Sequence, residues 1–207
     1  MTSLGRQLGE WAQWSRQADS GEDGWETMFP GWRELAKECQ RAMLSPNALD
    51  QVDHIAECWR ISEEAEEMAE FARKHVSALA TMLVELCRAC HPDVRWQAID
   101  VIGDTTIGFE ATFRAAFIDP DPYVRQRAFL AFARHRLVDH EMLKRVLSDP
   151  GPYVRRVAWE LAHRTGRAEE VAFVRQAMET DKSEVVRLAV TRPMDWLTAA
   201  PSGPQGE

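Results

Sequence analysis

Apolar residues recur at intervals of three and four along most of the chain, which is the spacing of one buried face of an α-helix. The clearest run is Val124, Ala128, Ala131 and Phe132 in the second half of the sequence. Runs of the same spacing cover 4–18, 32–44, 47–59 and 68–86 in the first half. The hydrophobic pattern therefore predicts an all-α protein.

Four segments of the second half share one motif at nearly constant spacing. Val-Arg pairs begin at positions 94, 124, 154 and 186, and Pro stands two residues before the Val in the first three. Pro suits the first position of a helix and cannot continue the helix before it. Helical spacing lies on both sides of each turn, so each unit is predicted to be helix, short turn, helix. An Asp precedes the Val by five residues in three units, at Asp119, Asp149 and Asp181.

This motif resembles the HEAT repeat in its short form of about thirty residues. The resemblance covers residues 89–195 and implies a right-handed α-solenoid of stacked helix pairs. It also implies that the turn Asp and the Arg after Val form a polar ladder from repeat to repeat. Ala89 stands where the first Asp would be, so we expect the ladder to begin at Asp119. Its arginines would be Arg95, Arg125, Arg155 and Arg187.

The chain is predicted to contain three segments. Residues 1–88 read as an N-terminal helical region of degenerate repeats that cap the stack, because terminal repeats of solenoids are atypical. Residues 89–197 contain the four HEAT-like repeats, and residues 198–207 are predicted to be a disordered tail. A chain of 207 residues is consistent with one such domain.

Charge is distributed unevenly along the sequence. The net charge is -8, of which residues 1–90 contribute -7 and residues 91–207 contribute -1. The acidic balance argues against a protein that coats nucleic acid. The second half nevertheless holds 14 Arg against 2 Lys, and Arg is suited to bidentate contacts with carboxylate or phosphate.

Targeting signals and membrane segments are not visible in the sequence. No apolar run approaches the ~20 residues that a transmembrane helix needs. The first residues show no apolar core of a signal peptide, and four Cys are too few for a disulfide scaffold. We therefore expect a cytoplasmic monomer that does not bind membranes.

The HEAT resemblance also suggests which residues face a ligand, because the second helix of each pair lines the concave groove in that family. Positions two, three and six after the Val are expected to face this groove. For the four repeats in order these are Trp96, Gln97 and Asp100; Gln126, Arg127 and Leu130; Arg156, Val157 and Glu160; and Leu188, Ala189 and Arg192. One turn further along lie Asp104, Arg134 and Arg164. Trp96 is either a contact anchor in this groove or a packing residue between neighbouring helices.

One constellation in this set points to a different function. Trp96, Asp100 and Arg127 resemble the groove residues of the HEAT-like-repeat alkylpurine DNA glycosylases. That resemblance implies that the carboxylate stabilises an oxocarbenium-like sugar, the aromatic ring contacts a cationic lesion and Arg holds phosphate. Trp59 and Glu63 are similar to a Trp-then-Glu helix pair of that family. The chain departs from the family at Trp159, which lies two positions out of register with the expected further groove Trp.

The motif Cys87-Arg-Ala-Cys90-His91 spells a c-type haem attachment signature. That chemistry requires export, which no sequence feature supports, and a zinc or redox site would lack a second ligand pair. No Gly-rich phosphate loop is present. We therefore expect no cofactor and no metal.

Two functional hypotheses follow. The first is a non-catalytic HEAT-repeat module that binds a protein partner through its concave groove, with an inhibitor or immunity-type protein as its narrower form. Its candidate binding residues are Trp96, Asp100, Arg127, Arg134, Arg156, Glu160 and Arg164. The alternative is an alkylpurine DNA glycosylase in DNA repair, with Trp96, Asp100 and Arg127 as catalytic residues and DNA as partner.

Overall fold

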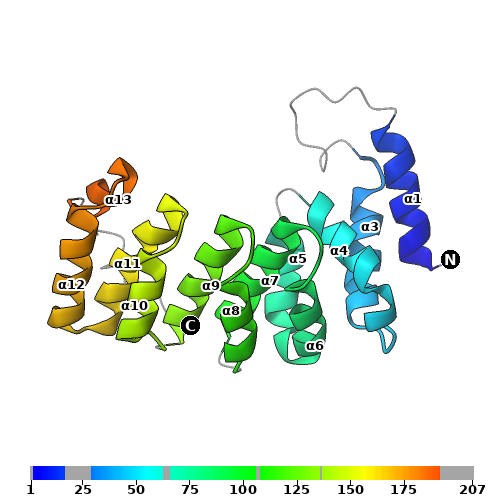
Figure 1. Cartoon of the computed structure of the whole chain (residues 1–207). Coiled ribbons are helices and arrows are strands. Elements are labelled where there is room, and N and C mark those ends of the chain that lie inside the picture. The colour runs from blue at the N-terminus through cyan, green and yellow to red at the C-terminus, as the bar shows by residue number, and fades with distance from the viewer. Residues whose placement is uncertain (1, 17–28, 63–65, 106–107, 136, 192–207) are drawn as a thin grey trace, which may run out of the picture. The chain divides into compact units, whose positions relative to one another are not determined.

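The computed structural model describes residues 2–16, 29–62, 66–105, 108–135 and 137–191 (Figure 1). Every regular element in these ranges is a helix, and none of the described residues is in a β-strand. The predicted all-α fold class is thereby confirmed. The helices form two compact units, residues 1–137 and 138–207. The predicted tail, 198–207, lies outside the described ranges.

The first unit is built around α7 (Pro92–Gly103), which contacts α4, α5, α6 and α9. Helix α8 packs on α9, and α1 packs on α3 and α4. Short helices are marginal in isolation, so this mutual burial is what holds them. The remaining bounds are α1 (Ser3–Ser15), α3 (Trp32–Met43), η1 (Leu49–Gln51), α4 (Val52–Ile61), α5 (Glu66–Lys74), α6 (Val76–Leu86), α8 (Glu110–Ala116) and α9 (Pro122–Arg134).

The second unit consists of two helix pairs. Helix α11 contacts α10, α12 and α13, so it occupies the centre of this unit. The bounds are α10 (His140–Leu147), α11 (Pro152–Thr165), α12 (Ala168–Glu179) and α13 (Glu184–Ala189). No helix in the described part of the chain has both the length and the apolar character needed to cross a bilayer.

Proline and aspartate define the predicted turns. The helices α7, α9 and α11 each begin with Pro at the first helical position, after an extended residue. At the α8–α9 turn, Asp119 Oδ1 accepts a hydrogen bond from the backbone N–H of Asp121 at 2.9 Å. Asp149 and Asp181 make the equivalent bond two residues ahead, at 2.7 and 2.8 Å. These local bonds explain why Asp recurs at this position, since its short side chain closes the turn.

The polar ladder is present within each unit. Arg95 binds both carboxylate oxygens of Asp119 at 2.8 Å, and its Nη1 donates to the carbonyls of Ala89 and Cys90 in its own turn. Arg155 binds Asp181 in the same bidentate way, at 2.7 and 2.9 Å. Each of these arginines therefore caps one turn and ties it to the next. As expected, the first carboxylate of the ladder belongs to Asp119.

The core follows the predicted positions of the repeat. Val94, Ala98 and Ile102 are fully buried in α7, and Val124 and Ala128 are fully buried in α9. The two helices approach so closely that a Cβ on the glycine at 103 would lie 2.7 Å from the Ala131 Cβ. A methyl group at that site would force the α7–α9 pair apart, so Gly is required for close packing.

A charge in this seam should unfold the protein. We expect Val124→Asp to abolish cooperative unfolding or to lower the free energy of unfolding by several kcal/mol, because it buries an unpaired carboxylate. Ile118→Asp is the control, since Ile118 is 73% exposed in the neighbouring turn. Urea titrations followed by circular dichroism measure both. Equal stability of the two variants would contradict the assigned core.

The ladder should make stability depend on pH. The hydrogen bonds from Arg155 hold the pKa of Asp181 below its ordinary value, so the pair stabilises the fold above that value. We expect Asp181→Asn to lose about 1–3 kcal/mol at pH 7. The difference from wild type should shrink as the pH falls below about 4, because the carboxylate of the unfolded chain then takes up a proton while the folded protein still holds it ionised against Arg155. Urea titrations of both proteins between pH 7 and pH 3 test this, and a constant difference would contradict it.

Candidate functional site

Side chains from α5, α7 and α9 meet in one surface cluster of the first unit. Helix α7 contributes a Trp and an Asp one turn apart, the residue that caps its C-terminus is a second Asp, and α9 contributes a Tyr and two Arg on the facing side. Helix α5 adds a third Arg. We call this the aromatic–arginine cluster; its members are Arg73, Trp96, Asp100, Asp104, Tyr123, Arg127 and Arg134.

The indole ring of Trp96 lies in the α7–α9 interface and is half-buried. Its edge meets Tyr123 at a centroid distance of 5.2 Å, and its Nε1 donates to Asp93 at 3.3 Å. The Arg127 guanidinium lies over both rings, 5.4 Å from the Trp96 centroid and 4.9 Å from that of Tyr123. The Arg127 side chain also hydrogen-bonds the Tyr123 hydroxyl. Trp96 therefore packs between the two helices and keeps part of its side chain accessible.

Asp100 lies at the centre of the three guanidinium groups. Its carboxylate is 3.2 Å from Arg134, 3.6 Å from Arg127 and 3.6 Å from Arg73, and only 16% of its side chain is exposed. Arg134 and Arg73 also contact Asp104, at 3.0 and 3.1 Å. Three cations thus share two carboxylates. The arrangement is a rigid ionic network in which Asp100 is the shared partner.

The structure brings together four of the predicted residues, Trp96, Asp100, Arg127 and Arg134. Arg156, Glu160 and Arg164 belong to α11 in the second unit, where Arg164 binds Glu160 at 2.8 Å. Two expected groove positions are wrong: Gln97 and Val157 are buried and cannot face a ligand. The third position after Val turns inward in these two helices because it shares the buried side with the Ala next to it. Arg192 lies outside the described residues.

The further tryptophans do not extend the cluster. Trp59 is fully buried in α4, and Glu63 is outside the described residues. Trp59 therefore does not line an open site, as its similarity to a residue of the glycosylase helix pair had suggested. Trp159 is also buried; His163 packs against its ring at 4.5 Å and Arg175 lies over it at 5.3 Å. Both tryptophans act as core residues.

The Cys-x-x-Cys-His motif ends α6 and enters α7. Cys87 is half-buried and burial raises the pKa of its thiol, whereas a metal or haem site requires an available thiolate. His91 Nδ1 accepts a hydrogen bond from the Asp93 backbone N–H at 3.4 Å, so it acts as a helix cap. No group of three potential metal ligands occurs among the described residues.

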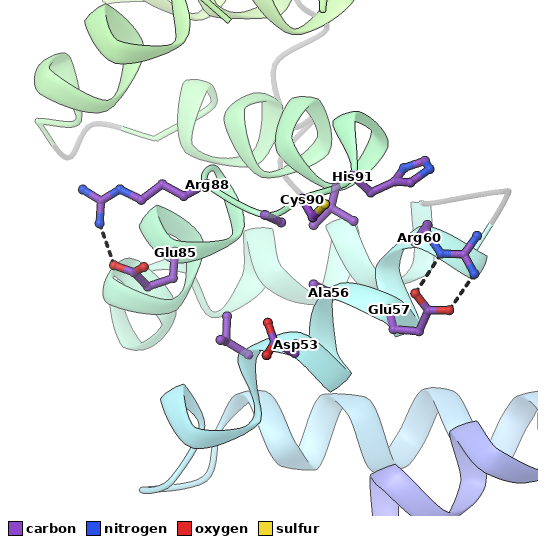
Figure 2. A pocket seen from close by; sticks show the side chains of 11 residues that line it. Asp53, Ala56, Glu57, Arg60, Glu85, Arg88, Cys90 and His91 are labelled. Carbon is purple, nitrogen blue, oxygen red and sulfur yellow. Dashed lines mark hydrogen bonds and ion pairs between the residues drawn. The ribbon is translucent and has the colours of Figure 1, made fainter. Parts of the chain in front are cut away.

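A pocket of about 390 Å³ opens between α4 and the segment that joins α6 to α7 (Figure 2). Its walls carry the ion pairs Glu57–Arg60 and Glu85–Arg88, with contacts of 2.5 and 2.7 Å. Cys90 lies on the opposite wall from α4 and is exposed. The pocket belongs to the first unit and shares no residue with the aromatic–arginine cluster.

Three features of these sites were absent from the sequence prediction. The sequence did contain a signal that could have identified Tyr123, because Pro-Tyr-Val-Arg occurs in two repeats. In the structure Tyr123 is 40% exposed. Arg73 lies on α5, outside the repeat motif, and no periodicity relates it to Asp100. The pocket depends on how α4 packs beside α7, which no local pattern encodes.

Comparison with known proteins identifies the repeats. Residues 110–194, which span α8 to α13, match the family model described as HEAT repeats. No curated protein matches the chain. No solved structure matches it either.

The shared role of Asp100 leads to a testable dependence on salt. Asp100→Asn removes the central negative charge and leaves the three guanidinium groups facing one another. We expect a loss on the order of 1 kcal/mol in the free energy of unfolding at low salt, and a smaller loss at 0.5 M NaCl, because salt screens the repulsion. Glu110→Gln, which breaks an exposed pair with Arg114, is the control. A loss that does not change with salt would contradict this network.

Proposed function

Since this chain is a HEAT-like repeat protein, we propose that it is a non-catalytic binding module for a protein partner. HEAT repeats form stacked helix pairs, and such stacks present extended surfaces on which partners bind. We place the central contact on the aromatic–arginine cluster of α7 and α9. We propose that Arg156, Glu160 and Arg164 of α11, in the second unit, are further residues that bind a partner.

The observation that carries this proposal is the accessible pair of rings held by Arg127. Trp, Tyr and Arg are the residue types enriched at binding hot spots, because they offer large contact areas with a polar group at the edge. Tyr123 and Trp96 are fixed by each other and by Arg127, so little side-chain entropy would be lost when a partner binds. This is the property expected of an anchor in a preformed interface.

The ion pairs favour a protein over DNA as partner. A DNA-binding face needs Lys or Arg side chains that are available for phosphate. Here Arg73, Arg127 and Arg134 share contacts with Asp100, and the two arginines at the edges also contact Asp104. Residues 1–137 contain 15 basic and 22 acidic residues, a net charge of -7, which opposes approach to a polyanion.

The narrower form of the proposal is an inhibitor or immunity-type protein in the cytoplasm. Its support is the same negative charge, which would accelerate association with a basic toxin or enzyme. The charge itself leaves the partner unnamed.

Alkylpurine DNA glycosylase activity is the second candidate, because Trp96, Asp100 and Arg127 lie together as that resemblance requires. Two contacts weigh against it. Arg127 lies over the Trp96 ring, and Asp100 is already paired with three guanidinium groups. Catalysis would require this network to open.

The experiment begins with the partner that co-purifies with the tagged protein from its native cells. We expect Trp96→Ala to raise the dissociation constant of the reconstituted complex by about thirtyfold or more, since a central aromatic anchor contributes ~2 kcal/mol. Ile118→Ala is the matched control, because it removes an exposed apolar side chain at a turn. Isothermal titration calorimetry measures both.

Two results would overturn the assignment. Equal affinity of wild type and Trp96→Ala would remove the cluster from the interface. Release of 7-methylguanine from alkylated duplex DNA by wild type, abolished in Asp100→Asn, would establish the glycosylase in its place. Micromolar DNA affinity that falls steeply with salt would support that second result.

A further inference from the structure

The pocket beside α4 is lined by both apolar and charged side chains. Val52 and Ala56 of α4 are half-buried and line its space of about 390 Å³, whereas Val94 of α7 behind them belongs to the core. That space accommodates one long side chain or a small ligand. Figure 2 shows the pocket between α4 and the Cys90 segment, with one ion pair at each side.

Asp53 is the one charged group of this pocket without a partner among the described residues. Arg60 is held by Glu57 through two hydrogen bonds, at 2.5 and 2.8 Å, and these bonds lower the pKa of the Glu57 carboxyl. Arg88 is held by Glu85 and His91 contacts Asp93. The Asp53 carboxylate makes no hydrogen bond or ion pair with any described residue, and in Figure 2 it lies between the two ion pairs.

The Arg–Asp ladder is interrupted at Ala89, which lines this pocket. A regular turn carries Asp at the position of Ala89, where it would bind an Arg from the preceding repeat, as Asp119 binds Arg95. Ala89 has no carboxylate, and Arg60 of α4 binds within its own helix. No ion pair among the described residues ties α4 to this turn, and the pocket lies between them.

We propose that this pocket binds a basic side chain, Arg or Lys, presented by a protein partner. The aliphatic stem would lie on Val52 and Ala56, and the cationic head would pair with Asp53. Burying the stem while the charge meets a carboxylate is how long basic side chains are accommodated. The net charge of -7 on residues 1–137 attracts a basic partner to this unit.

This site is separate from the aromatic–arginine cluster, and the inference does not rest on the function proposed for it. The two share no residue, so each is tested by its own variant. A partner that contacts both would be anchored at two points of the same unit.

Cys90 provides a reporter for occupancy of the pocket. It is exposed and lines the site, whereas Cys39 and Cys58 are buried. Cys87 is half-buried and its pKa is raised by burial, which lowers its reactivity. Iodoacetamide, which is uncharged, should therefore alkylate Cys90 first, and a bound side chain should slow that reaction.

The probe is N-acetyl-arginine methylamide, and the readout is the rate of Cys90 alkylation in the full chain by peptide mass spectrometry. We expect saturable protection that reaches about fivefold at four times the dissociation constant. The citrulline analogue has the same shape without the charge and should protect little. Asp53→Asn should abolish the protection by the arginine probe, whereas Asp50→Asn, an exposed neighbour in η1, should retain it.

Equal protection by the two analogues, or full protection in Asp53→Asn, would overturn the proposal. Absence of protection in wild type would overturn it as well, and that result needs no variant to fold. Trp96→Ala should leave the protection unchanged. A loss of protein-partner affinity in Trp96→Ala alone would therefore concern the cluster and not the pocket.

Discussion

The bidentate pair between a helix arginine and the aspartate of the following turn is the interaction on which the repeat geometry depends. Arg95 and Arg155 each bind a carboxylate at 2.7–2.9 Å and also donate to carbonyls of their own turn. A planar guanidinium with five donors can satisfy both partners at once. The pair therefore closes one turn and ties it to the next.

The burial of the repeat's apolar positions decides which side chains reach the surface. With Val94 and Ala98 directed into the core, Trp96 and Asp100 remain at the outer edge of α7. The close approach of α9, which requires glycine at position 103, brings Arg127 and Tyr123 onto the same patch. The proposed interface is thus a consequence of repeat packing, with rings and charges that hold each other in place.

The pocket lies beside a turn where the regular pair is missing. Ala89 stands in place of the turn aspartate. In α4, Glu57 and Arg60 pair within their own helix, and Asp53 has no partner among the described residues. The turns at Asp119 and Asp181 use their carboxylates in the ladder, whereas Asp53 beside the turn at Ala89 has no partner among the described residues. The proposed recognition of a basic side chain uses that carboxylate.

The sequence alone determined the helical fold and the positions of the Pro turns, because both depend on residues at fixed local spacing, and the resemblance to HEAT repeats implied the ladder. It also placed Trp96, Asp100 and Arg127 in one region, because two adjacent repeats share the same register. Only the tertiary structure showed that Gln97 and Val157 are buried, since their exposure depends on how closely the neighbouring helices pack. The approach of Arg73 to Asp100 across α5 and α7, and the open space beside Asp53, were likewise decided by packing between helices that no repeat relates. Local periodicity specifies which face of a helix is apolar, and contact with other helices decides what that face and its edges meet.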